Sequence, residues 1–214
     1  MLIKDLVEFL KHEDTRWSSR DYENIKIPFQ ISSESYLEFS EEDFKEKNVH
    51  SLVNALSNAK RALDCRIDSL LISLGIYEKA KKDRWGVPRK LEEIQKYGII
   101  APRVLKKINS VRNLVEHEFI KPDEEQIGDF IDIVCLFLAS TDRYIYDFPT
   151  NSQIENGTLS NYWLDIEFDY DRKIIKIRII LQESENEEIE LDMKDSECSD
   201  FLKEYLRVTI SYNK

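Results

Sequence analysis

The most regular pattern in the chain is a series of apolar residues that recur every three or four positions between Val49 and Leu74. This period predicts an amphipathic helix of about seven turns. Asn48 precedes the series as an N-cap residue and Gly75 follows it as a C-terminal stop, so both ends of the helix are marked. A shorter helix is expected over residues 89–97.

Two prolines frame the next two predicted helices. Pro102 stands in the first turn, where a helix tolerates proline best, and that helix must end near Lys121 because Pro122 follows. The acidic residues after Pro122 suit the positive end of a further helix, over roughly 123–146. Its apolar face is wider than a surface helix needs, which suggests a second packing partner such as a twin subunit. The residues that widen it are Ile133, Leu136 and Phe137.

The first 47 residues carry weaker patterns. Residues 2–11 form a short amphipathic pattern that predicts a helix. Residues 17–44 are mixed, and we expect irregular chain with short strands over 25–31 and 36–39. We therefore separate an N-terminal extension, residues 1–47, from a helical bundle over residues 48–148.

The period changes to two beyond Asp147, where apolar and polar residues alternate. After a polar linker over 150–160, three strands are expected, then a helical turn over 199–205 and a last strand over 207–212. Residues 149–214 thus read as an acidic, β-rich appendage. The predicted fold class is α+β, an antiparallel helical bundle followed by a small antiparallel β meander. The three strands are expected over 162–170, 174–181 and 188–193.

Charge is distributed unevenly along this chain of net charge −11. Residues 1–48 hold 7 Lys/Arg against 12 Asp/Glu, residues 49–148 hold 16 against 15, and residues 149–214 hold 8 against 15. Both flanks repel phosphate, so capture of nucleic acid over the whole surface is disfavoured. Only the middle segment is neutral enough to hold a local phosphate site.

Compartment and cofactor signals are plain. No apolar run is long enough for a bilayer, the first residues do not resemble a signal peptide, and we expect a cytoplasmic protein without a membrane partner. The three cysteines have no metal-type spacing, and neither a cofactor nor a metal site is expected. Cys65 and Cys135 lie in apolar helical surroundings, where core packing is a more common role than reactivity.

The helix that begins at Pro102 carries a polar cluster. Its apolar stripe leaves Asn113 and His117, four residues apart, together on nearly the opposite face, with Arg112 on the flank of the stripe. His117 then points to water or into a groove made by another element. The simplest interpretation is a solvated histidine beside an Arg112–Glu116 ion pair, worth about 0.2–0.5 kcal/mol.

A functional interpretation follows from the chemistry of RNA. The 2′-hydroxyl of RNA is an internal nucleophile, so strand cleavage requires no metal. It does need a group of near-neutral pKa for proton transfer, which suits His117. It also needs a permanent cation for the charge that develops on the phosphoryl oxygens, which suits Arg112, while Asn113 can orient either group. Two copies facing across a dimer axis would make a cleft.

The segment RNLVEH, residues 112–117, resembles the signature of the HEPN family, which has arginine, a polar residue, three further residues and histidine. The order of predicted helices over residues 48–148 also resembles that of the family. The resemblance implies a dimeric, metal-independent endoribonuclease, of a type that commonly serves as a toxin or effector in prokaryotic defence and stress systems. It implies that Arg112 and His117 are catalytic and that Asn113 supports them.

Two hypotheses therefore stand. One is a homodimeric HEPN-type ribonuclease that cuts RNA to a 2′,3′-cyclic phosphate or 3′-phosphate and a 5′-hydroxyl, for which a neutralising or regulatory protein is a candidate partner. The other is a non-catalytic HEPN-like dimerisation module that binds a protein partner, a nucleotide or RNA. Its acidic β appendage would then be the recognition surface, and the charge of that appendage suits a basic protein.

Other polar residues have simpler interpretations. His12 and His50 are isolated, which is typical of surface histidines. Four basic residues beside Trp85 either form a solvated turn or contact an RNA backbone. The same alternatives hold for three basic residues that precede the motif. These two groups are Lys79, Lys81, Lys82 and Arg84, and then Arg103, Lys106 and Lys107.

Overall fold

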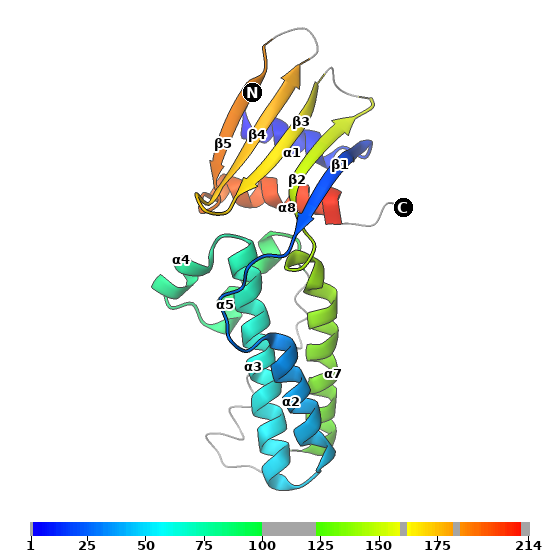
Figure 1. Ribbon diagram of the computed structural model, residues 1–214, viewed down its shortest axis with the longest axis vertical. Coiled ribbons are helices and arrows are strands. Elements are labelled where there is room, and N and C mark those ends of the chain that lie inside the picture. Colours follow the sequence, from blue (N-terminus) through cyan, green and yellow to red (C-terminus); the bar gives the residue numbers. More distant parts are fainter. Residues whose placement is uncertain (1, 100–122, 159–161, 182–184, 211–214) are drawn as a thin grey trace.

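The computed structural model describes residues 2–99, 123–158, 162–181 and 185–210 of the 214-residue chain. The molecule is elongated, with an antiparallel sheet and its covering helices at one end and a group of packed helices at the other (Figure 1). The α+β class predicted from the sequence is confirmed. No helix of the described ranges is long and apolar enough to cross a bilayer.

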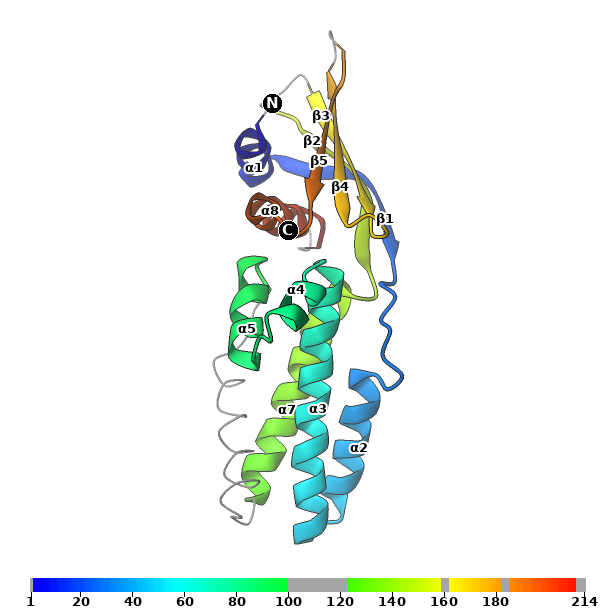
Figure 2. The ribbon, with the colours of Figure 1, turned by 90° about the vertical axis from the view of Figure 1, so that its left-hand side faces the viewer.

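The sheet has five strands in the order β1-β2-β3-β4-β5, each antiparallel to the next. Helices α1 (Ile3–Lys11) and α8 (Ser196–Ile210) lie against the same face of it (Figure 2). Three predicted strands and the predicted N-terminal helix are thus confirmed, as β3 to β5 and α1. The strands are β1 (Thr15–Glu23), β2 (Phe148–Asn156), β3 (Tyr162–Asp169), β4 (Ile174–Leu181) and β5 (Glu187–Asp192).

Alternation along β3 and β4 divides the sheet into an apolar face and a charged face. Leu164 and Ile166 are buried, whereas Asp165 and Glu167 between and after them are more accessible. Charged residues of opposite sign stand opposite each other on neighbouring strands, an arrangement that favours this register. These pairs are Asp165 with Arg178 and Glu167 with Lys176. In the part of the chain that the structure describes, no helix covers the charged face (Figure 2).

Strands β1 and β2 lie in segments that were not predicted to belong to the sheet. β2 occupies most of the predicted linker 150–160, and β1 lies within the predicted N-terminal extension 1–47. They pair from Thr15 with Asn156 onward, so helices α2 to α7 are inserted between two neighbouring strands. The linker prediction was wrong because the inward side chains of β2 include Ser152 and Asn156, which are buried through hydrogen bonds rather than as apolar groups.

Helix α3 (Val49–Ser73) confirms the strongest prediction from the sequence. Asn48 Oδ1 accepts a hydrogen bond of 3.0 Å from the N–H of Ser51, as expected of an N-cap. Gly75 follows the helix with φ +74, a conformation that glycine adopts without strain. A side chain there would also collide with Met193, because an added Cβ would lie 2.8 Å from the Met193 Cβ.

Helix α2 (Ser33–Lys45) stands where the sequence predicted a short strand over 36–39, and residues 25–31 form no strand either. Its buried positions, Ser33, Leu37 and Ser40, recur every three or four residues but include only one large apolar side chain. That pattern is too weak to identify a helix from sequence. Ser40 Oγ donates to the carbonyl oxygen of Ala55 at 2.7 Å, so small residues bring α2 close to α3.

Three more helices complete the described part of this end of the molecule. Helices α5 and α7 both pack on α3, and α5 confirms the helix predicted over 89–97. Helix α7 ends earlier than the predicted 146 and continues as a single 3₁₀ turn, η1. The bounds are α4 (Tyr77–Lys82), α5 (Val87–Lys96), α7 (Glu124–Thr141) and η1 (Asp142–Tyr144).

Helix α8 replaces the last strand predicted over 207–212, at least as far as Ile210, where the described residues end. The alternation of Val208 and Ile210 suggested a strand, but burial follows the helical period instead. Tyr205 and Thr209 are both fully buried and four residues apart. Packing of this segment against the sheet and α1 favours the helix over a strand. Such a tertiary interaction cannot be deduced from the local sequence pattern.

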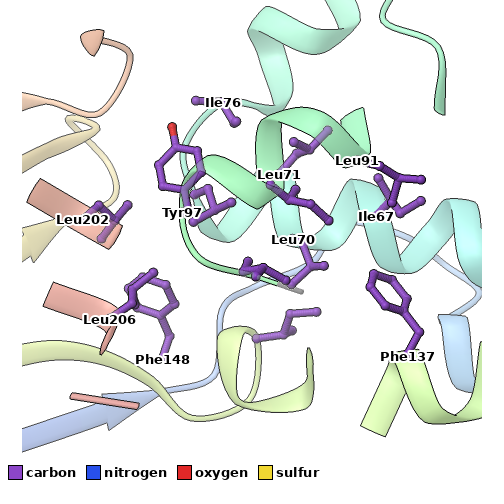
Figure 3. Close-up of a cluster of buried hydrophobic side chains, with 14 of the residues drawn as sticks. Ile67, Leu70, Leu71, Ile76, Leu91, Tyr97, Phe137, Phe148, Leu202 and Leu206 are labelled. Carbon is purple, nitrogen blue, oxygen red and sulfur yellow. The ribbon is translucent and has the colours of Figure 1, made fainter. Parts of the chain in front are cut away.

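The sheet and the helices share one hydrophobic core. Figure 3 shows the place where they meet, with Leu70 and Leu71 of α3, Phe148 of β2 and Leu206 of α8 in one cluster. Tyr97, which follows α5, lies in the same cluster and is buried. The junction between the two ends of the molecule is therefore a packed interface and not a loose linker.

Candidate functional site

The predicted catalytic residues Arg112, Asn113 and His117 belong to residues 100–122, outside the described residues. Arg103, Lys106 and Lys107 belong there as well. The structure describes the two helices that flank this segment. Helix α5 comes before it, and α7 follows it with Asp123 as N-cap, whose Oδ1 accepts a 2.9 Å hydrogen bond from the N–H of Gln126. Both flanking helices contact α3.

The sequence analysis missed a buried cation on α3. The Arg66 side chain is 0 % exposed, and its Nη2 contacts two carboxylates, Glu34 and Asp142. Nη2 lies 2.9 Å from Asp142 Oδ1. The guanidinium carbon also lies 5.7 Å from the ring centroid of Tyr146, whose hydroxyl donates to Glu34 Oε1 at 3.0 Å. These four side chains form one polar cluster. Three of them come from α2, α3 and η1, and the fourth, Tyr146, follows η1.

The electrostatics of this cluster favour the charged form of Glu34. Burial opposes ionisation of Glu34, but a backbone hydrogen bond, the charge of Arg66 and the Tyr146 hydroxyl together lower the pKa of its carboxyl. Burial, followed by the hydrogen bond to Glu34, raises the pKa of Tyr146 to about 12. Tyr146 is therefore a neutral donor and Glu34 an ionised acceptor at neutral pH.

The cluster joins the two chain segments that connect the helices with the sheet. Glu34 stands at the start of α2, just after the segment from β1, and Asp142 stands at the end of α7, just before β2. Arg66 holds both at the middle of α3. Its Nε and Nη1 are buried and have no hydrogen-bond partner in the described ranges. The ion pairs with Glu34 and Asp142 nevertheless give Arg66 a structural role, since a buried guanidinium is stable only where carboxylates compensate its charge.

A sequence signal for Arg66 existed but was faint. The residue lies four positions after Ala62 and three before Ser69, within a row of small buried residues on α3. An arginine in such a row is as compatible with a solvated edge as with burial, because its long side chain can reach water from many positions. Its acidic partners are distant in sequence, so the ion pairs could not be anticipated.

The cysteines differ in their exposure. Cys198 is buried and Cys65 is half-buried, and burial raises the pKa of their thiols to about 12 and about 11. Both are therefore protonated at neutral pH. Cys135 is exposed on α7, which corrects the prediction that it packs in the core. The helix is apolar on more than one side, so its composition alone did not show which side faces outward.

The wide apolar face predicted for α7 is divided between core and surface. Phe137 is 2 % exposed and belongs to the core, and Ile133 is partly buried. Leu136, next to Cys135, is 70 % exposed. A large exposed leucine on a long helix is compatible with the predicted second packing partner, which stays a prediction.

The remaining sequence candidates lie at the surface. His50 is exposed at the start of α3, near the side chain of Asn54, and His12 is partly exposed. The basic residues beside Trp85 are all exposed, whereas the Trp85 ring itself is buried. The surface role expected for His50 is confirmed, and the basic group is accessible to a ligand.

A pocket of about 420 Å³ opens between the segment after β1, the end of α3 and the turn after β3. Its size is in the range of small-molecule sites, which span about 300–1,000 Å³. Tyr77 and Tyr170 contribute aromatic walls beside apolar residues, and the charged part of the lining consists of two lysines and two glutamates. These charges balance, so the lining selects neither anions nor cations. The four residues are Glu23, Lys26, Glu78 and Lys173.

Comparisons of the chain with protein-family models, with curated proteins and with solved structures gave no match. Within the described residues, no group of three or more histidine, cysteine, aspartate or glutamate side chains is arranged to hold a metal ion. The RNLVEH segment and the surfaces described above are therefore the features of this chain that point to a function.

Proposed function

We propose that the protein is a metal-independent endoribonuclease of the HEPN type that acts as a dimer. The observation that carries the proposal is the spacing of Arg112, Asn113 and His117 in a segment between two helices of one bundle. In this proposal residues 48–148 form a HEPN-like bundle, and RNA is the substrate.

The described helices support the proposal. The long helix α3 is followed by the shorter α5, then by the segment that holds the motif, and then by α7. Because α5 and α7 both contact α3, the helices on either side of the motif segment belong to the same group of packed helices (Figure 2). This order is the one that the resemblance leads us to expect.

Each proposed catalytic residue has a chemical role. His117 transfers protons, to or from the 2′-hydroxyl and the leaving 5′-oxygen, as a group of near-neutral pKa can do. Arg112 donates hydrogen bonds to the phosphoryl oxygens as negative charge develops on them. Asn113 orients the imidazole or the phosphate. The attacking 2′-oxygen displaces the 5′-oxygen at phosphorus, which gives a 2′,3′-cyclic phosphate and a 5′-hydroxyl.

The proposed dimer would bring two copies of this motif into one cleft. Support comes from α7, where Leu136 and Cys135 are exposed beside one another on the outer side of the helix, next to Asp132. Covering the exposed leucine with a second copy of the chain would remove apolar surface from water, which stabilises the dimer. The exposed face of α7 is therefore the surface that we assign to the twin subunit.

The experiment is a cleavage assay on total RNA in excess EDTA. We compare the native chain with the Arg112→Ala and His117→Ala variants, and use His50→Ala as the control for loss of an unrelated, exposed histidine. Both motif variants should be inactive and the control should cut at the native rate. Full activity of His117→Ala would contradict the proposal.

The charged face of the sheet favours a second candidate function, a non-catalytic module that binds a protein partner. Asp165, Glu167 and Glu190 lie on this face with Lys176 and Arg178 between them. The β-rich end of the chain has a strong excess of acids, which suits a basic partner. Binding of such a partner by an inactive native chain would favour this function over the first.

A further inference from the structure

Helix α4, the turn after it and the start of α5 carry a strong local excess of positive charge. Residues 77–90 contain six Lys/Arg and two Asp/Glu, in a chain whose net charge is −11. Figure 1 shows α4 projecting sideways from the junction between helices and sheet. Five of the six basic residues are exposed, and we call them the α4–α5 basic surface. They are Lys79, Lys81, Lys82, Arg84 and Arg89.

These five cations are not used in ion pairs within the part of the chain that the structure describes. Other lysines nearby are paired, including Lys60 with Asp64, Lys90 with Asp68 and Lys96 with Glu93. Even Glu78 and Asp83, which lie in the same segment, form no salt bridge with the basic surface. In an acidic chain with so many available carboxylates, an unpaired cluster of this kind keeps its full charge for an external anion.

Two buried residues hold the α4–α5 basic surface against the core. Ala80 is 1 % exposed and Trp85 is 8 % exposed, so both ends of the turn are fixed in the core. The N–H of Trp85 donates to the carbonyl oxygen of Ala80 at 2.9 Å, and Arg84 between them adopts φ +52. The guanidinium carbon of Arg89 lies 4.8 Å from the centroid of the Trp85 ring, a stacked cation–π contact. The backbone that carries these charges is therefore held in one position.

We propose that the α4–α5 basic surface binds the phosphodiester backbone of single-stranded RNA. Lysine ammonium groups act as point charges toward phosphate and carry no base-reading geometry, so the binding is sequence-independent. The acidic flanks of the chain repel the same strand, which disfavours its binding to those parts of the molecule. The choice of RNA rests on the proposed function, whose substrate this surface would hold outside the catalytic residues.

The test measures RNA binding without cleavage. In a His117→Ala background, Lys79, Lys81 and Lys82 are replaced together by glutamine, and fluorescence anisotropy reports binding of a short labelled single-stranded RNA over a series of salt concentrations. A matched triple variant replaces three exposed lysines outside the surface, Lys4, Lys45 and Lys194. The urea midpoint of each protein is measured, because the comparison requires that all are folded.

Three lost phosphate contacts should raise the dissociation constant at least about tenfold and make the slope of log K against log salt shallower by about 2. The control triple variant should bind like its parent. The proposal is overturned if the two triple variants lose affinity equally, or if the α4–α5 variant keeps the affinity and salt slope of its parent. Binding of the parent to anionic lipid vesicles but not to RNA would also overturn it.

The outcomes for this surface and for the proposed function can be told apart. A native chain that binds RNA through Lys79, Lys81 and Lys82 but never cuts it would contradict the ribonuclease and leave the surface in place. A native chain that cuts RNA, with unchanged binding in the triple variant, would leave the ribonuclease in place and contradict the surface.

Discussion

Arg66 Nη2 lies 2.9 Å from Asp142 Oδ1, and the same nitrogen contacts Glu34, so one buried cation holds both chain segments that connect the helices with the sheet. The segment from β1 reaches α2 at Glu34, and the segment to β2 leaves α7 at Asp142. The relative position of the two ends of the molecule therefore depends on this arginine as well as on the core of Figure 3.

The acids around Arg66 should be more important for stability than their partial exposure suggests. Replacing Glu34 with Gln and Asp142 with Asn leaves a fully buried guanidinium without a counter-charge. We expect the double variant to lose about 3–5 kcal/mol in the free energy of unfolding. Urea denaturation measures the loss.

The matched control for this experiment removes two acids that are exposed and unpaired in the described structure, through Glu38→Gln and Asp171→Asn. That variant should unfold within about 0.5 kcal/mol of the parent. Equal stability of the Glu34/Asp142 variant and this control would show that the cluster contributes nothing.

Stability should depend on pH through Glu34. The pKa of this carboxyl is lowered in the folded protein from its ordinary value of 4.5, so folding favours the ionised form. Its contribution is complete above the unfolded value and is lost as the pH falls through the folded value. The urea midpoint of the parent should therefore fall more steeply below pH 4.5 than that of Glu34→Gln. The control variant Glu38→Gln should follow the parent, and identical curves for all three proteins would contradict the assignment.

The reactivity of Cys135 should report the proposed dimer. It is the exposed thiol, whereas burial raises the pKa of Cys65 and Cys198 and keeps them protonated. At low protein concentration a disulfide reagent should titrate one thiol quickly, and Cys135→Ser should remove that signal. The rate should fall as rising concentration drives dimerisation, because Leu136 beside it would become covered. A rate that stays constant while sedimentation shows a dimer would place the interface elsewhere.

Tyr205 should stabilise the contact between α8 and the sheet. Its buried hydroxyl lies 2.8 Å from Ser152 Oγ and donates to the Pro149 carbonyl oxygen at 3.0 Å. Tyr205→Phe leaves these groups without a partner, and we expect a loss of about 1–3 kcal/mol in thermal or urea unfolding. Tyr36→Phe, at a partly exposed position of α2, should cost far less. Equal losses would mean that the hydroxyl of Tyr205 is not the cause.

The sequence predicted those elements whose information is local. Helix α3 has a long apolar period and a capping residue at Asn48, and strands β3 and β4 alternate clearly between Leu164 and Ile179. The pairing of β1 with β2 was missed because the partners, such as Thr15 and Asn156, are far apart in sequence and held by polar contacts. No local period contains that information.

The candidate site shows the same division. The spacing from Arg112 to His117 could be interpreted from sequence because one predicted helix carries the whole motif. The burial of Arg66 could not, since it depends on Glu34 and Asp142 from two other elements. Likewise, sequence gave the charges of Lys79 to Arg84 but not their lack of carboxylate partners in the described structure, which needs the positions of all neighbouring side chains.

The most direct test of the central claim asks whether the RNA itself supplies the nucleophile. A labelled RNA that the native chain cuts at one position is compared, in excess EDTA, with the same RNA carrying a single 2′-deoxy nucleotide on the 5′ side of that phosphate. The account predicts a 2′,3′-cyclic phosphate end from the first RNA, no cleavage of the second, and no cleavage of either by His117→Ala. Cleavage of the 2′-deoxy substrate, or cleavage that persists in His117→Ala, would contradict it.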